Sequence, residues 1–188
     1  MDRQKIGQRA KYCTVAVLLL ALNGCFSSGG DDPKPEPTPP PTPTPTPTPV
    51  IAVQGAAVKG PLAHSEISVF ALDLTASGFK GELIAQGATD AQAKISALEV
   101  PESNDSPLLI EFVATGASVD LTTGNPPVLK RMRNIITQQM LDDGNSIYAT
   151  PLTTMVVDLA LSKTSQLTEL DTNLTLSNEQ IASTMGFG

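Results

Sequence analysis

Few side chains in this sequence have the type and spacing needed for chemistry. The one histidine, His64, has the chemistry of a general base or a metal ligand, but no second histidine can join it. We therefore interpret His64 as a solvated loop residue. Asp31-Asp32 and Asp142-Asp143 carry oxygens that suit a hard cation, but neither pair has the alternating oxygen ligands of a calcium loop. A flexible tether and a helix end explain these two pairs better.

The sequence motifs of common enzymes are absent. There is no G-x-S-x-G nucleophile elbow, no phosphate-binding P-loop, no G-x-G-x-x-G and no H-E-x-x-H. No pair of acids has a convincing spacing for glycoside hydrolysis. We therefore predict that the chain is not an enzyme and that it has no catalytic residue, no cofactor and no metal site.

The basic residues of the chain do not form a nucleic-acid footprint. The formal net charge is −7 and the pI is near 4.6, so we predict no nucleic-acid partner. Lys130, Arg131 and Arg133 form a small basic patch that could contact anionic head groups. We favour the simpler interpretation, in which they occupy the exposed face of an amphipathic helix.

One thiol, Cys25, has a context that points to chemistry. Four basic residues crowd the first eleven positions, and an apolar run of ten residues, from Cys13 to Leu22, follows them. This run is too short to span a bilayer as a helix. A basic start, a short apolar run and small residues before a cut are typical of a secretory signal. The alternative, a buried N-terminal helix, has nothing in the following segment to pack against.

The end of this signal, Leu22-Asn23-Gly24-Cys25, resembles the lipobox of Gram-negative bacterial lipoproteins. The resemblance implies that residues 1–24 are a signal peptide, that lipid is attached to the Cys25 sulfur, and that the new amino group is acylated. Several acyl chains anchor a protein stably, whereas one does so only marginally. Phe26 stands where an aspartate often marks retention in the inner membrane, so the family pattern favours the outer membrane. The implied partner is the lipid bilayer, bound through acylated Cys25.

Residues 25–49 combine this cysteine with a linker rich in proline and threonine. Alternating Pro and Thr between Pro33 and Pro49 can form neither helix nor sheet, because proline lacks an N–H and fixes φ. We predict a disordered linker with polyproline II character that reaches roughly 50 Å. Holding a domain away from the lipid is its simplest role, and binding to a proline-recognition domain is the alternative.

Residues 50–124 have the pattern of a mainly β fold. "HSEISVFAL" alternates, with Ile67, Val69 and Ala71 on one face, which predicts a half-buried strand. Residues 81–89 and 107–115 predict two further strands, and Gly78, Gly81 and Asp90 predict turns. Short strands at this spacing suggest a small antiparallel β-sandwich.

"QGAAVKGPLAHSEISVFAL" resembles the start of carboxypeptidase-regulatory-like, transthyretin-like β-sandwich repeats. The matching positions are Gly55, Val58, the Gly60-Pro61 pair and the strand that follows. "ATDAQAKI" resembles their hairpin, with Ala93 where a glycine is expected. Alanine tolerates a positive φ poorly, so we expect a different turn there. The resemblance implies a prealbumin-like or Ig-like sandwich over residues 54–116.

Residues 125–188 have a helical pattern. Leu129, Met132, Ile136 and Met140 are spaced by three and four, which predicts a helix over 125–144. Residues 150–163 repeat the pattern, with Thr150 as N-cap and Pro151 as first helical residue.

A third helix is expected over 176–188, with Ser177 and Gln180 as a capping box and Leu176 and Ile181 as a hydrophobic staple. We expect this helical segment to open a larger or truncated domain, so that the chain is the first part of a longer protein.

The leading hypothesis is a lipid-anchored surface lipoprotein of the cell envelope that presents a β-sandwich module. Adhesion, envelope scaffolding and ligand capture are its candidate roles, toward a surface or envelope partner that the sequence does not name. The alternative is the stalk and accessory module of a longer secreted enzyme. A carbohydrate-binding module is a third class, which the absence of Trp and the low aromatic content of 4% disfavour.

Overall fold

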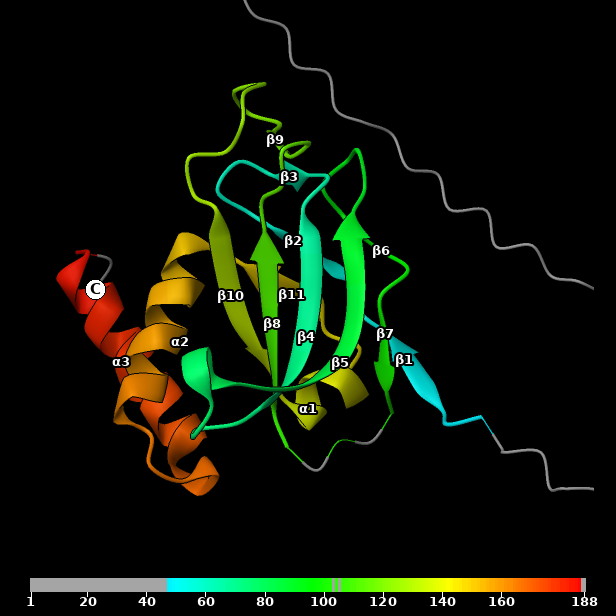
Figure 1. Ribbon diagram of the computed structural model, residues 1–188. Helices are drawn as coiled ribbons and strands as arrows, with labels where there is room; N and C mark the ends of the chain where they lie inside the picture. The colour runs from blue at the N-terminus through cyan, green and yellow to red at the C-terminus, as the bar shows by residue number, and fades with distance from the viewer. Residues whose placement is uncertain (1–46, 103, 105, 187–188) are drawn as a thin grey trace, which may run out of the picture. The chain divides into compact units, whose positions relative to one another are not determined.

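The centre of the fold is a five-stranded antiparallel sheet with the strand order β10-β8-β4-β5-β6 (Figure 1). The structure is a computed structural model, and it describes residues 47–102, 104 and 106–186. The strands of this sheet are β4 (Glu66–Leu72), β5 (Lys80–Thr89), β6 (Ile95–Ser96), β8 (Leu108–Val113) and β10 (Arg131–Ile136).

Three short strand pairs accompany the sheet. Two pairs are antiparallel, β1 (Val50–Ala52) with β7 (Glu99–Pro101) and β3 (Leu62–Ala63) with β9 (Val119–Asp120). The third, β2 (Gly55–Ala57) with β11 (Ile147–Ala149), is parallel. The helices are η1 (Ser77–Phe79), α1 (Gln138–Asp142), α2 (Pro151–Lys163), η2 (Leu167–Glu169) and α3 (Leu170–Thr184).

The central sheet buries apolar side chains on both faces. Successive side chains of a strand point to opposite faces, so β8 sends Ile110 and Phe112 to one side and Leu109 to the other. On the inner face, β2, β11, α1 and the segment around β7 cover the larger core. On the outer face, Val157 and Leu161 of α2 pack with Leu109 and neighbouring residues in a smaller core. The outer face is covered mainly at β10, where α2 lies (Figure 1).

The prediction of a mainly β fold with short helices is confirmed. The finer prediction of a two-sheet sandwich is not, because one five-stranded sheet curls over a core that short strand pairs and α1 cover. The strands expected at 64–72, 81–89 and 107–115 are present as β4, β5 and β8. Gly81, expected in a turn, lies within β5 instead.

The helix predicted over 125–144 is wrong for most of its length. Residues Arg131–Ile136 form β10, which pairs with β8 throughout, and only Gln138–Asp142 are helical. Met132 and Ile136 are four residues apart, a spacing that puts both on one face of a helix but also on one face of a strand. Pairing with β8 provides the backbone hydrogen bonds that stabilise the strand rather than a helix.

The helix expected at 150–163 is confirmed with its cap. Thr150 accepts a hydrogen bond from the backbone of Thr153, and Pro151 is the first helical residue. The cap predicted at Ser177 is wrong, since α3 already begins at Leu170 and Ser177 is buried within it. Among the described residues, no helix is both long enough and apolar enough to span a membrane.

Candidate functional site

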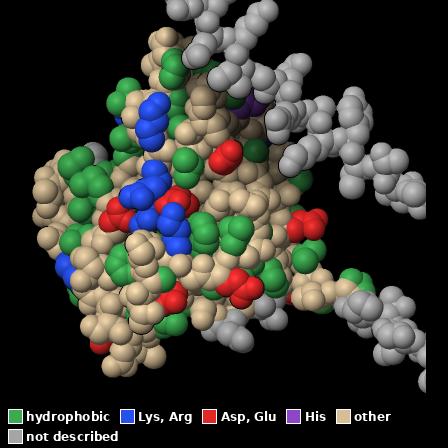
Figure 2. All heavy atoms as spheres, in the orientation of Figure 1, with side chains coloured by type: hydrophobic (Ala, Val, Ile, Leu, Met, Phe, Trp, Pro, Cys, Tyr) green, Lys and Arg blue, Asp and Glu red, His purple; other side chains and the backbone are tan. Residues whose placement is uncertain are grey.

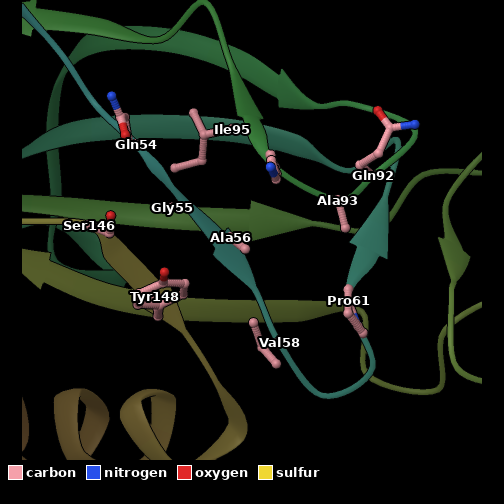
Figure 3. A pocket seen from close by; sticks show the side chains of 11 residues that line it. Gln54, Gly55, Ala56, Val58, Pro61, Gln92, Ala93, Ile95, Ser146 and Tyr148 are labelled. Atoms are coloured by element: carbon pink, nitrogen blue, oxygen red, sulfur yellow. The ribbon is translucent and has the colours of Figure 1, made fainter.

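A hollow of about 620 Å³ lies over the short parallel pair of β2 and β11 (Figure 3). Three segments line it: β2 with its flanking residues, the turn formed by residues 92–95, and Ser146 with Tyr148 at β11. We call it the Tyr148 hollow. Its volume lies in the range of sites that bind small molecules.

Three residues form one row across the floor of this hollow. Tyr148 is the cross-strand partner of Ala56 in the parallel pair, and Ala56 also forms an antiparallel bridge with Lys94. Paired residues of adjacent strands project to the same side. The row therefore runs from an aromatic ring through a methyl group to an ammonium group. Because the side chain of Ala56 is small, a space remains between the side chains of Tyr148 and Lys94.

The strand pair beneath the row is fixed by a glycine. An ideal Cβ at Gly55 would lie 1.7 Å from the carbonyl oxygen of Ile147, and the φ of Gly55 is +147°. Only glycine allows β2 to approach β11 this closely. The backbone N–H of Ile147 donates to Gln54 and that of Val58 donates to Ala149, which closes the ladder at both ends. Ile147 is fully buried in the core below.

The turn that carries Lys94 is built around one carboxylate. Asp90 accepts hydrogen bonds from the backbone N–H groups of Gln92 (2.8 Å) and Lys94 (2.9 Å). Ala93 lies in the left-handed region with φ +62° and is fully buried. Our expectation that alanine would force a different turn is therefore wrong. The backbone of Ala93 is strained in this conformation, and the two hydrogen bonds to Asp90 hold the turn in it.

The chemistry of the hollow combines an exposed ring with one positive charge. Tyr148 is 52% exposed, although most large apolar and aromatic residues of the fold are buried. Among the described residues that line the hollow, Lys94 is the only charged one, and Gln54, Gln92 and Ser146 add uncharged polar groups. In the described part of the chain, no carboxylate lies within 4.0 Å of the Lys94 ammonium. This arrangement suits an anion with an apolar or ring-shaped body.

A cluster of charged side chains lies on the outer face of the central sheet (Figure 2). Its centre is Glu111 on β8, whose side chain is only 5% exposed. Lys80 Nζ lies 2.8 Å from Glu111 Oε2, and Arg133 Nε lies 3.0 Å from Oε1. Arg131 Nε is more distant, at 3.7 Å, and Arg133 Nη1 also bonds Asp158 of α2 at 3.0 Å.

The charges of this cluster are paired with one another, which indicates a structural role. Burial raises the pKa of Glu111, but the hydrogen bonds and the positive charges of Lys80 and Arg133 together lower it more, so the net direction is downward from 4.5. The prediction of a basic patch on the exposed face of a helix is therefore wrong. Lys130 and Arg131 are exposed, but Arg133 is buried in a strand and its charge is already paired. Its guanidinium is not available to an anionic surface.

The remaining candidate residues lie apart from one another. His64 is exposed in the turn between β3 and β4, as expected, and its carbonyl oxygen accepts from the Ser118 hydroxyl at 2.9 Å. Asp142 and Asp143 are at the end of α1, where Asp142 accepts from Gln138 at 2.8 Å. Within residues 47–102, 104 and 106–186, no three His, Cys, Asp or Glu residues are grouped to hold a metal.

Three candidate residues, Cys25, Asp31 and Asp32, lie outside the described residues, as do the predicted signal and most of the linker. Sequence reasoning missed the Tyr148 hollow entirely. Its row joins residues 56, 94 and 148, which only the fold brings together. A local signal existed at β11, where the exposed Tyr148 stands between the buried residues Ile147 and Ala149, a two-residue alternation typical of a strand.

Comparisons with protein-family models, with curated proteins and with solved structures found no match for this chain. The signal-like N-terminus and the Tyr148 hollow are the features of this chain that bear on its function.

Proposed function

We propose that this protein is a lipid-anchored lipoprotein of the Gram-negative cell envelope, held in the outer membrane through acylated Cys25. The observation that carries the proposal is the order of features in the sequence. A basic start and a short apolar run end at Leu22-Asn23-Gly24-Cys25, and the Pro/Thr-rich segment follows at once. In this arrangement lipid replaces the apolar polypeptide at Cys25 as the membrane-binding element.

The folded part is the module that this anchor presents. Strand β1 begins at Val50, directly after the last proline of the linker. We assign the module a binding or structural role rather than catalysis, because the Tyr148 hollow has the polarity of a ligand site. Adhesion, scaffolding and ligand capture are its possible uses, and the hollow favours ligand capture.

We further propose that the module derives from the carboxypeptidase-regulatory-like β-sandwich. The support is local geometry at the matching positions. Gly60 has a φ of +98° in the turn that brings Val58 opposite Pro61, and an alternating strand follows. Ala93 keeps a left-handed turn where that family has glycine.

Metabolic labelling tests the anchor. Cells that express the protein are grown with radioactive palmitate, and the protein is immunoprecipitated. We expect label on the wild type and none on Cys25→Ser. Cys13→Ser is the matched control, since Cys13 lies in the segment that cleavage removes, and we expect it to keep the label. An unlabelled wild type, or label that persists in Cys25→Ser, contradicts the proposal.

A further inference from the structure

We propose that the Tyr148 hollow binds a small carboxylate that carries a ring. The ring would lie against Tyr148 over Ala56, and the carboxylate would bond the Lys94 ammonium. This inference deepens the proposed function, on which it rests, by naming the ligand class of the presented module. It depends on the row that runs from Tyr148 through Ala56 to Lys94.

The size of the ligand follows from the strand spacing. Adjacent strands are 4.7–4.9 Å apart, so the backbones that carry Tyr148 and Lys94 are separated by roughly 10 Å. Ala56 lies between them and contributes a single methyl group. A six-membered ring with one carboxylate fits across such a gap, with the ring toward Tyr148 and the charge toward Lys94. A much longer molecule would extend out of the row.

The preference for a ring follows from Tyr148. This residue is 52% exposed, and the parallel strand pair, in which Gly55 allows the close approach, fixes its backbone. Aromatic rings present a broad apolar surface on which flat or ring-shaped groups pack favourably. Because β2 and β11 are held by the core beneath them, the backbone that carries Tyr148 is in place before a ligand arrives. Pre-organisation of this kind reduces the entropy lost on binding.

The preference for an anion follows from Lys94. It is the one charged residue among the described residues that line the hollow. Asp90, four residues earlier, directs its carboxylate to the backbone N–H groups of Gln92 and Lys94. The ammonium of Lys94 has no carboxylate within 4.0 Å in the described part of the chain. A bound carboxylate would therefore supply the partner for a charge-assisted hydrogen bond.

Two sources share this chemistry, aromatic acids and acidic sugars. Both present a ring of similar size and one carboxylate. The amides of Gln54 and Gln92, which line the same hollow, can donate and accept hydrogen bonds, and so would favour a ring with hydroxyl groups. The experiment has one arm for each source and a neutral counterpart for each acid.

Isothermal titration calorimetry on the protein purified from its membrane in detergent micelles tests the inference. The aromatic arm compares benzoate with benzamide, and the sugar arm compares glucuronate with glucose, each corrected for titration into empty micelles. We expect at least one acid to bind about tenfold more tightly than its neutral counterpart, the effect of one charge-assisted bond. Binding in only one arm identifies the source.

Variants assign the binding to this hollow. We expect Lys94→Gln to weaken binding of the acid about tenfold and to remove its advantage over the neutral counterpart. Tyr148→Ala should weaken acid and neutral ligand alike, and Ala56→Leu should block both by filling the floor. Lys130→Gln, at an exposed lysine that does not line the hollow, is the matched control and should bind like the wild type. Thermal melting of each variant separates lost binding from lost folding.

The inference is overturned if neither acid binds, if neutral counterparts bind equally well, or if Lys94→Gln binds like the wild type. None of these results affects palmitate labelling at Cys25, so failure of the ligand and failure of the anchor are distinguishable.

Discussion

Arg133 and Glu111 are direct cross-strand partners, with Arg133 Nε 3.0 Å from Glu111 Oε1 and with only 4% and 5% of their side chains exposed. The same arginine reaches Asp158 on α2 at 3.0 Å. Its backbone N–H donates to the Thr154 hydroxyl, also on α2. Arg133 therefore joins β8, β10 and α2, and it holds the helix against the edge of the sheet.

Removing one partner of this buried pair should destabilise the fold. Arg133→Met leaves the Glu111 carboxylate with fewer partners, and we expect a loss of about 3 kcal/mol in the free energy of unfolding. The double variant Glu111→Leu with Arg133→Met should recover part of that loss, because no buried charge is then unpaired. Urea unfolding measures all three proteins.

Arg131→Gln, at an exposed arginine 3.7 Å from Glu111, is the control and should cost less than about 1 kcal/mol. A double variant less stable than Arg133→Met alone would contradict this account.

The stability of the protein should depend on Glu111 at acid pH. Its pKa is lowered from 4.5 in the folded state, so the unfolded chain takes up the proton first as the pH falls. The stabilisation by Glu111 is complete above about pH 4.5 and is lost as the pH falls through the folded-state pKa. Urea unfolding of wild type and Glu111→Gln, from about pH 6 to about pH 3, measures it. The stability difference between the two should shrink on acidification, and a constant difference would refute the assignment.

The edge of the sheet at β10 should depend on a hydroxyl of α2. Thr154 Oγ1 accepts a hydrogen bond from the backbone N–H of Arg133 at 2.9 Å. Thr153 Oγ1 donates one to the carbonyl oxygen of Arg133 at 3.0 Å. Thr154→Val keeps the shape but leaves that N–H without its acceptor, which should cost about 1–3 kcal/mol. Thr172→Val, at an exposed position of α3, should change stability by less than about 0.5 kcal/mol. Equal effects of the two substitutions would argue against this role for Thr154.

The turn at Ala93 should reject a branched side chain. Ala93 has a φ of +62° and no exposed surface, so a valine there meets both backbone strain and overpacking. We expect Ala93→Val to cost about 2 kcal/mol of stability. Ala91→Val, in the same turn but exposed, is the matched control and should be nearly neutral. Thermal unfolding compares them, and an Ala93→Val protein that melts with the control would disprove the strain.

Local signals in the sequence predicted local structure correctly. The alternation in β4 and the Thr150-Pro151 start of α2 depend on neighbours within a few residues, and both are present in the fold. The prediction of a helix through Met132 was wrong because a spacing of four residues fits both the helical period of about 3.6 and the strand period of two. Pairing with β8, whose partner residues lie 18 to 28 positions earlier in the chain, decided the outcome.

The false cap at Ser177 has a similar cause. The serine and the glutamine three residues later have the pattern of a capping box, but the helix starts seven residues earlier, at the buried Leu170. Reciprocal bonds between Gln166 and Glu169 cap the turn before it. The Tyr148 hollow was beyond sequence reasoning for the same reason, since its row requires two long-range strand pairings to be known first.

Mass spectrometry of the N-terminal peptide, from protein purified from its bacterial membrane, tests the lipid anchor most directly. We predict a peptide that begins at Cys25 and carries acyl chains on both its sulfur and its amino group. A peptide that begins at Met1, or a Cys25 thiol without lipid, would contradict the account.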